Sequence, residues 1–164
     1  MNPQLSELEI VQNQALGAFA IWQFGLGYQA DDGRPAALPL AFLVLPLLLH
    51  TQTLETIQST RRASGLTLFA AKLGEERENL LAVHERARCL RELTLESIGL
   101  GIRSKLLSLD YADASVRANA LLGSSANPPL PERLKGLPKS AEKIGYWFSK
   151  AGLTQVANTL KVEF

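Results

Sequence analysis

The sequence predicts a mainly α-helical protein: a compact single helical domain over residues 1–164 with one β-hairpin. Three observations support this fold class. Apolar residues recur at helical spacing through most of the chain, the longest apolar run contains only one β-branched residue, and paired strand-like segments around a turn occur over residues 106–118. At 164 residues the chain is long enough to bury one hydrophobic core.

Composition and charge are those expected of a soluble, cytoplasmic globular protein. Hydrophobic residues make up 46% of the chain, and the formal net charge is +1. A net charge this small gives no general attraction to nucleic acid or membranes, so such a contact would need a local patch. The single cysteine, Cys89, leaves no pair for an internal disulfide, which suits a reducing compartment.

The first helix is expected to begin after an N-terminal extension, residues 1–12. Asn13 can accept a hydrogen bond from the first helical turn, and the segment Gln14–Tyr28 that follows is apolar on nearly every face. We therefore expect this helix to be buried on several sides. The polar run Asp31–Pro35 predicts a turn after it.

The apolar run Ala36–Leu49 is the most distinctive segment of the chain. It is too short to span a membrane, which takes about 20 apolar residues. We expect one buried helix here, with Pro39 in its first turn and Pro46 kinking its interior. Together with the first helix it would form a paired core inside the protein.

Start and stop signals predict further helices and a hairpin through the middle of the chain. The expected elements are a short helix capped by Thr51 or Thr53, a helix over Leu66–Leu73 that ends at Gly74, a helix over Glu75–Glu92, and a helix capped by Thr94. Leu106–Leu109 and Ser115–Ala118 then flank a polar turn, which predicts the hairpin.

The C-terminal part is expected to begin with a proline-rich loop, residues 123–139. Ser140 can cap a helix over Ala141–Ala151, and Gly152 is its predicted stop. A short helical turn from Thr154 and a strand over Lys161–Phe164 would end the chain.

Residues typical of a catalytic, cofactor-binding or metal site do not occur at suitable spacing. The two histidines, His50 and His84, and Cys89 show no metal-ligand spacing. His50 stands at a predicted helix end, where a structural role is more usual. No base lies near Cys89 in the sequence, so a partly buried, unreactive thiol is favoured. We therefore expect no enzyme activity and no cofactor.

The aromatic triplet Tyr146–Trp147–Phe148 indicates a contact with another protein. Consecutive helical residues cannot all face one core, so at least one ring is expected at the surface or against a partner. Tyrosine and tryptophan are common anchors at interfaces. The hypothesis places a partner interface at Tyr146, Trp147 and Lys150, and burial of the rings in the protein's own core is about equally supported.

DNA binding is the alternative hypothesis. A helix followed directly by a hairpin resembles the last helix and wing of a winged-helix domain, which would place Arg103, Lys105 and Arg117 near a phosphate backbone. The competing interpretation is that glutamates neutralise the central arginines and that these side chains only solvate the surface. The low net charge favours this second interpretation.

Four segments, in order, resemble the middle component of bacterial three-component ABC (ABC-3C) systems. The first fits the helix pattern N-x-A-L-G-A-x-x-x-W-x-F. The matching residues are Asn13, Ala15, Leu16, Gly17, Ala18, Trp22 and Phe24, then Pro39–His50, then Glu85–Arg88 with the helix ending in Leu106–Leu107, then Lys143–Gly152 with Leu160–Val162. Within the last segment, Lys161 replaces a glycine of the family pattern.

This resemblance implies a small non-enzymatic subunit. It would accompany an ABC-type ATPase of the chromosome-maintenance class and an effector, for which a nuclease is one candidate. The subunit would bridge ATPase and effector in defence against phage or other mobile DNA. ATP chemistry would belong to the ATPase, any DNA contact would be made through the complex, and no membrane partner is implied.

Overall fold

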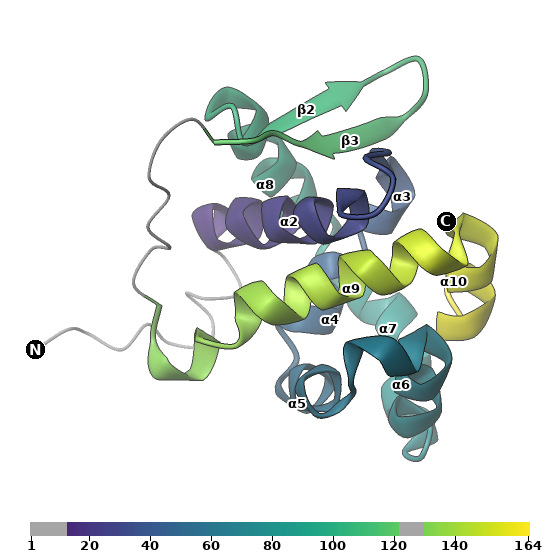
Figure 1. The fold of residues 1–164 in the computed structure, drawn as a ribbon. Helices are drawn as coiled ribbons and strands as arrows, with labels where there is room; N and C mark the ends of the chain where they lie inside the picture. Colours follow the sequence, from purple (N-terminus) through teal and green to yellow (C-terminus); the bar gives the residue numbers. More distant parts are fainter. Residues whose placement is uncertain (1–12, 122–129) are drawn as a thin grey trace, which may run out of the picture.

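The computed structural model describes residues 13–121 and 130–164, and within them the mainly α-helical class is confirmed. Figure 1 shows helices gathered around α2 (Gln14–Gln29), with a small sheet above it and α9 (Leu137–Ala151) beside it. The predicted N-terminal extension, residues 1–12, lies outside the described residues, as do residues 123–129 of the predicted proline-rich loop.

Helix α2 is the centre of the fold. It begins as predicted, because the Asn13 side chain accepts a hydrogen bond from the Leu16 amide at 3.0 Å. α9 packs on one side of it, and α8 (Arg91–Arg103) and strand β3 (Ser115–Ala118) pack on others. The expected burial on several sides is therefore confirmed.

The apolar run is buried inside the protein, but not as a single kinked helix. Its elements are strand β1 (Ala36–Ala37), helix α3 (Leu38–Ala41) and helix α4 (Val44–Leu48). Pro39 and Pro46 each lie in the first turn of a short helix, where backbone N–H groups have no intrahelical acceptor to lose. The predicted kink at Pro46 is wrong, because the helix is interrupted before this residue, between Ala41 and Val44.

Within the described residues, no single helix is both long and apolar enough to cross a membrane. One bent pair, Leu38–Leu48 with Thr51–Ser59, passes such a test of length and composition only when its two parts are joined, and it turns by 101° at its break. Several of its side chains, including Leu40, Leu45 and Leu47, are completely buried in the protein core.

The middle helices confirm the predicted pattern with corrected boundaries: the helix expected over Glu75–Glu92 spans only Arg77–Cys89, and Glu92 already belongs to α8. They are α5 (Thr51–Ser59), the short 3-10 helix η1 (Arg62–Ser64), α6 (Gly65–Leu73), α7 (Arg77–Cys89) and α8. His50 is the N-cap of α5, so the predicted caps at Thr51 and Thr53 are wrong. Thr94 lies inside α8 rather than capping it, because Leu93 and Thr94 already face the core.

The predicted hairpin is present and carries a third strand that was not predicted. β2 (Leu107–Asp110) pairs with β3, and β1 pairs with the other edge of β3, giving the order β1-β3-β2. The third strand consists of two alanines in an apolar run, which carry no local strand signal. α8 precedes the hairpin as the winged-helix hypothesis requires, but the likeness to that fold stays a prediction.

The C-terminal boundaries differ from those expected. α9 begins at Leu137 with Pro138 in its first turn, so Ser140 is a buried helical residue and not a cap. In the described part of the predicted loop, residues 130–139, the 3-10 helix η2 (Glu132–Leu134) is present and residues 137–139 already belong to α9. Gly152 ends α9 at φ 78° as predicted, and α10 (Leu153–Leu160) follows. Residues 161–164 form no strand.

Two glycines let α2 and α9 touch backbone to backbone. A methyl group on Gly27 would overlap the carbonyl oxygen of Glu142, and one on Gly145 would overlap the carbonyl oxygen of Phe24. Beside this contact, the rings of Phe24 and Phe148 meet edge to face with centroids 5.7 Å apart. The spacing between the two longest core helices is therefore set by residues that have no side chain.

Lys161 ends α10 in a backbone conformation that favours glycine. Lys161 adopts the left-handed conformation (φ 58°, ψ 46°) at the end of α10, and the Val162 amide donates back to the Ala157 carbonyl at 3.1 Å. Glycine is the usual residue in such a helix end because it has no Cβ to strain.

We expect Gly145→Ala to lower the free energy of unfolding by about 2 kcal/mol, because the new methyl group would force α2 and α9 apart. Urea denaturation measures this change. The matched control is Gly99→Ala in α8, where the methyl group meets only the flexible end of Arg103 at 3.3 Å. The free energy of unfolding of this control should rise by up to about 1 kcal/mol, because alanine has the higher helix propensity. Equal changes for the two substitutions would contradict a close backbone contact at Gly145.

We expect Lys161→Gly to raise the free energy of unfolding by about 1 kcal/mol, because it relieves the left-handed strain. Lys161→Ala removes the same side chain but keeps a Cβ, so its stability should stay close to that of the wild type. Thermal unfolding of the three proteins measures the difference. A gain shared by both variants would assign the effect to the lysine side chain instead of the backbone.

Candidate functional site

A cleft of about 240 Å³ lies between the start of α6 and the C-terminal half of α9. We call it the α6–α9 cleft. Its lining residues are Arg62, Ala63, Gly65, Leu66, Thr67, Tyr146, Trp147, Lys150, Ala151 and Gln155. It therefore contains all three residues of the predicted partner interface, together with Arg62, which that prediction did not include.

Tyr146 is the aromatic surface of the cleft. The guanidinium carbon of Arg62 lies 4.0 Å from the centre of the Tyr146 ring, and the Lys150 ammonium lies 5.4 Å from it. Both distances are within the range of cation–π attraction. The ring thus holds two positive side chains next to each other at the surface.

Trp147 lines the inner side of the cleft, and its side chain is buried in the protein core. Its side chain is 1% exposed, stacks on Phe69 with centroids 5.3 Å apart, and donates a hydrogen bond from Nε1 to the Arg62 carbonyl at 2.8 Å. The prediction that Trp147 presents an exposed anchor is therefore wrong. The neighbouring Tyr146 is the ring that reaches the surface, because consecutive helical residues point in different directions.

Lys150 is paired with Asp31, which follows the end of α2. This contact lowers the pKa of the Asp31 carboxyl and raises the pKa of the Lys150 ammonium, mainly through their hydrogen bond. Both side chains are largely exposed, so the pair adds little to stability. Its main effect is to neutralise one of the two cations of the cleft.

Two lysines fix the chain segment that carries Arg62. Lys143 donates to the carbonyls of Ile57 and Thr60 at 2.9 and 2.8 Å, and Lys72 donates to that of Ser59 at 3.0 Å. These carbonyls lie at the C-terminal end of α5, where cations are favourable. Burial, and secondarily Lys72, lowers the pKa of Lys143. Sequence reasoning missed these contacts because they join residues far apart in the chain. The one local signal is that α5 ends without a glycine, so its last carbonyl groups need other hydrogen-bond donors.

The residues of the DNA-binding hypothesis are exposed, but the structure gives them mixed surroundings. Arg117 donates to the Gly33 carbonyl at 3.0 Å, and the hollow beside it also contains Asp110 and Asp113. Arg103 ends α8, and Lys105 follows it in a left-handed conformation that turns the chain towards β2. Arg117 is thus engaged with its own chain near two carboxylates.

The groups considered for chemistry have structural surroundings. Within the described residues, no cluster of three or more histidine, cysteine or acidic side chains could hold a metal. Cys89 is exposed, so the expectation of partial burial is wrong, and its sulfur lies 3.9 Å from a Glu85 carboxylate oxygen.

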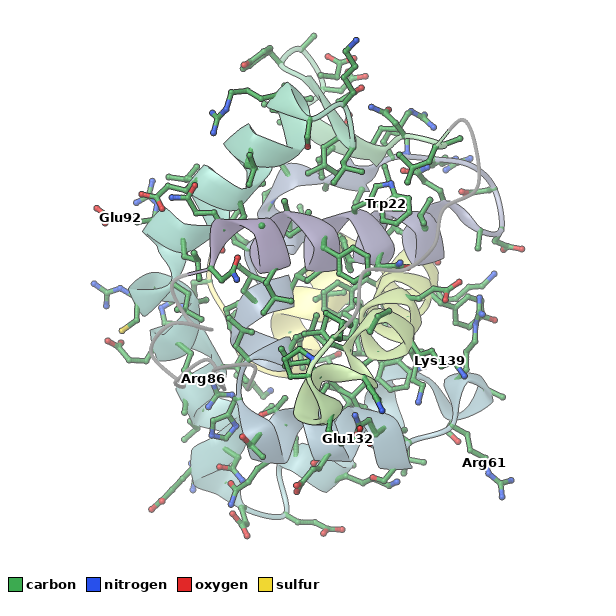
Figure 2. The ribbon with its side chains drawn as sticks, turned by 90° about the vertical axis from the view of Figure 1, so that its left-hand side faces the viewer. Trp22, Arg61, Arg86, Glu92, Glu132 and Lys139 are labelled. Atoms are coloured by element: carbon green, nitrogen blue, oxygen red, sulfur yellow. The ribbon has the colours of Figure 1, made fainter. Side chains whose placement is uncertain are left out.

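His50 belongs to a polar cluster that ties α5 to α7. Its Nδ1 lies 2.8 Å from the hydroxyl of the fully buried Thr53, which also accepts a hydrogen bond from Arg86 at 3.3 Å. Arg86 in addition donates to the Pro46 carbonyl at 3.3 Å. Burial and the nearby Arg86 charge lower the pKa of His50. Figure 2 shows Arg86 among the lower helices, away from Arg61.

A second hollow of about 430 Å³ lies between α3, α7 and the C-terminal residues. Its lining is mainly apolar and includes Leu38, Phe42, Ala87 and Val162, with Arg88 and Arg91 at one side. It shares no lining residue with the α6–α9 cleft. This hollow and the α6–α9 cleft therefore differ in chemical character.

A comparison with protein families identifies one match. The family model described as "ABC-three component (ABC-3C) system Middle Component 3" matches residues 1–164. No curated protein and no solved structure shows significant similarity to the chain.

We expect stability to fall as the pH drops below about 6.5, in part because of His50. Unfolded His50 binds a proton near that pH, whereas the lowered pKa makes the folded protein bind it only at lower pH. His50→Gln should therefore show a weaker loss of stability on acidification, measured by urea denaturation across this range. The control His84→Gln removes the other histidine and should keep the His50 contribution; identical pH profiles of His50→Gln and wild type would contradict the assignment.

Proposed function

Because this chain belongs to the Middle Component 3 family of ABC-three component (ABC-3C) systems, we propose that it is a non-enzymatic adaptor subunit that bridges an ABC-type ATPase and an effector. The observation that carries the proposal is the match over residues 1–164, since the family is defined as one component among several. The proposed setting is bacterial cytoplasmic defence against phage or other mobile DNA, with a chromosome-maintenance-like ATPase and, as one candidate effector, a nuclease.

Bridging requires two contact surfaces, and two hollows of the described chain, the α6–α9 cleft and the one beside α3 and α7, share no lining residue. The α6–α9 cleft combines tyrosine and arginine, which are enriched where proteins meet. The hollow beside α3 and α7 is mainly apolar, which suits a different partner segment. This arrangement supports an adaptor that contacts two components at once.

The alternative, a DNA-binding regulator, has less support. Arg117 is engaged with the Gly33 carbonyl, and Asp110 and Asp113 share its hollow. Carboxylates at this place would repel a phosphate backbone. Arg103 and Lys105 remain exposed next to the hairpin, so binding of duplex DNA at low salt is the outcome that would favour this alternative.

Co-expression with the ATPase and effector of the same system tests the proposal. We expect all three proteins to elute together in size-exclusion chromatography. Without this chain, the ATPase and effector should elute separately, because the adaptor joins them. A chain that stays monomeric beside both, or an ATPase–effector complex that forms equally well without it, would contradict bridging.

A further inference from the structure

We propose that the α6–α9 cleft binds an acidic segment of a partner component, with Arg62 as the principal contact for a carboxylate. This inference rests on the proposed adaptor function and adds the place and chemistry of one contact. It goes beyond the family assignment, which names no binding surface.

The charges of the cleft are unbalanced in favour of an anion. Among the described residues that line it, Arg62 and Lys150 are positive and none is negative. Lys150 is already paired with Asp31, but in the described chain no carboxylate lies within 4.0 Å of the Arg62 guanidinium. The neighbouring Arg61 does not line the cleft, and Figure 2 shows its side chain extending from the molecule into solvent.

Arg62 is held in place before any partner arrives. Its carbonyl accepts the hydrogen bond from buried Trp147, and its guanidinium lies over the Tyr146 ring. A ring that covers one face of a guanidinium leaves the N–H groups at its edge free to donate, and two of them match the two oxygens of a carboxylate. Because the side chain is already ordered, less conformational entropy is lost on binding.

The surroundings of Arg62 favour a protein segment over nucleic acid. Leu66, Ala63 and Ala151 form apolar walls in a cleft of about 240 Å³, which suits a side chain better than a duplex backbone. Leu68 on α6 and Leu153 on α10 are 42% and 38% exposed, so apolar contacts are available on both flanking elements.

Binding measurements on the reconstituted complex test the inference. Immobilised ATPase and effector are each titrated with wild-type chain and with Arg62→Glu, and we expect the charge reversal to weaken binding to one of them about tenfold or more. The matched control is Arg77→Glu at the start of α7, which makes the same change of charge outside the cleft and should leave the affinity unchanged. Thermal unfolding of each variant verifies that it folds.

A second pair of variants separates the role of Tyr146 from simple packing. Tyr146→Phe keeps a ring over Arg62 and should bind as the wild type does, whereas Tyr146→Ala frees the guanidinium and should bind several-fold more weakly. Raising the salt concentration should weaken the wild-type complex more than the Arg62→Glu complex, because only the former has the charged contact.

Each contrary outcome has a distinct meaning. If the wild-type chain binds neither component, the adaptor function and this inference both fail. If it binds, but Arg62→Glu and Arg77→Glu bind equally well, the inference is wrong while the adaptor function stands. If a duplex DNA probe binds the chain and Arg62→Glu abolishes only that binding, the cleft serves nucleic acid and the proposed acidic protein segment is overturned.

Discussion

The close contact between α2 and α9 is the constraint on which the rest of the structure depends. Gly27 and Gly145 bring the two backbones together, and a single methyl group at either position would collide with the opposite main chain. α2 is covered on its other sides by α8 and β3, so it cannot move away to make room. Part of the apolar run from Ala36, helix α4, packs against the same two helices, and its side chains are buried inside the protein.

The same constraint determines which residues of α9 reach the surface. With Gly145 against α2, the next position, Tyr146, points into the α6–α9 cleft, and Trp147 points into the core against Phe69. The indole N–H of Trp147 donates a hydrogen bond to the Arg62 carbonyl. One turn earlier on α9, the Lys143 ammonium donates to the Ile57 carbonyl at the end of α5. Core packing and the arrangement of the candidate site are thus properties of one helix, and a change in its register would disturb both.

Local signals predicted the parts of the fold that local chemistry decides. Asn13 begins α2, Gly152 ends α9, and the polar turn between β2 and β3 makes the hairpin, because each of these residues acts on its own neighbours. Long-range contacts decided the rest. The alanines of β1 become a strand only because β3 lies beside them, and the choice between Tyr146 and Trp147 depended on which side of α9 the core occupies. Arg62 escaped the site prediction because its partners lie about 80 residues further along the chain.

Amide hydrogen exchange can show whether a partner component binds at the α6–α9 cleft. It is measured on the chain alone and in complex with the ATPase and effector, because binding at the cleft should slow exchange in the segments that line it. We expect added protection in residues 61–67 and 149–155 of the bound chain, with little change at the hairpin, residues 107–118. Protection confined to the hairpin, with residues 61–67 exchanging as in the free chain, would contradict binding at the cleft.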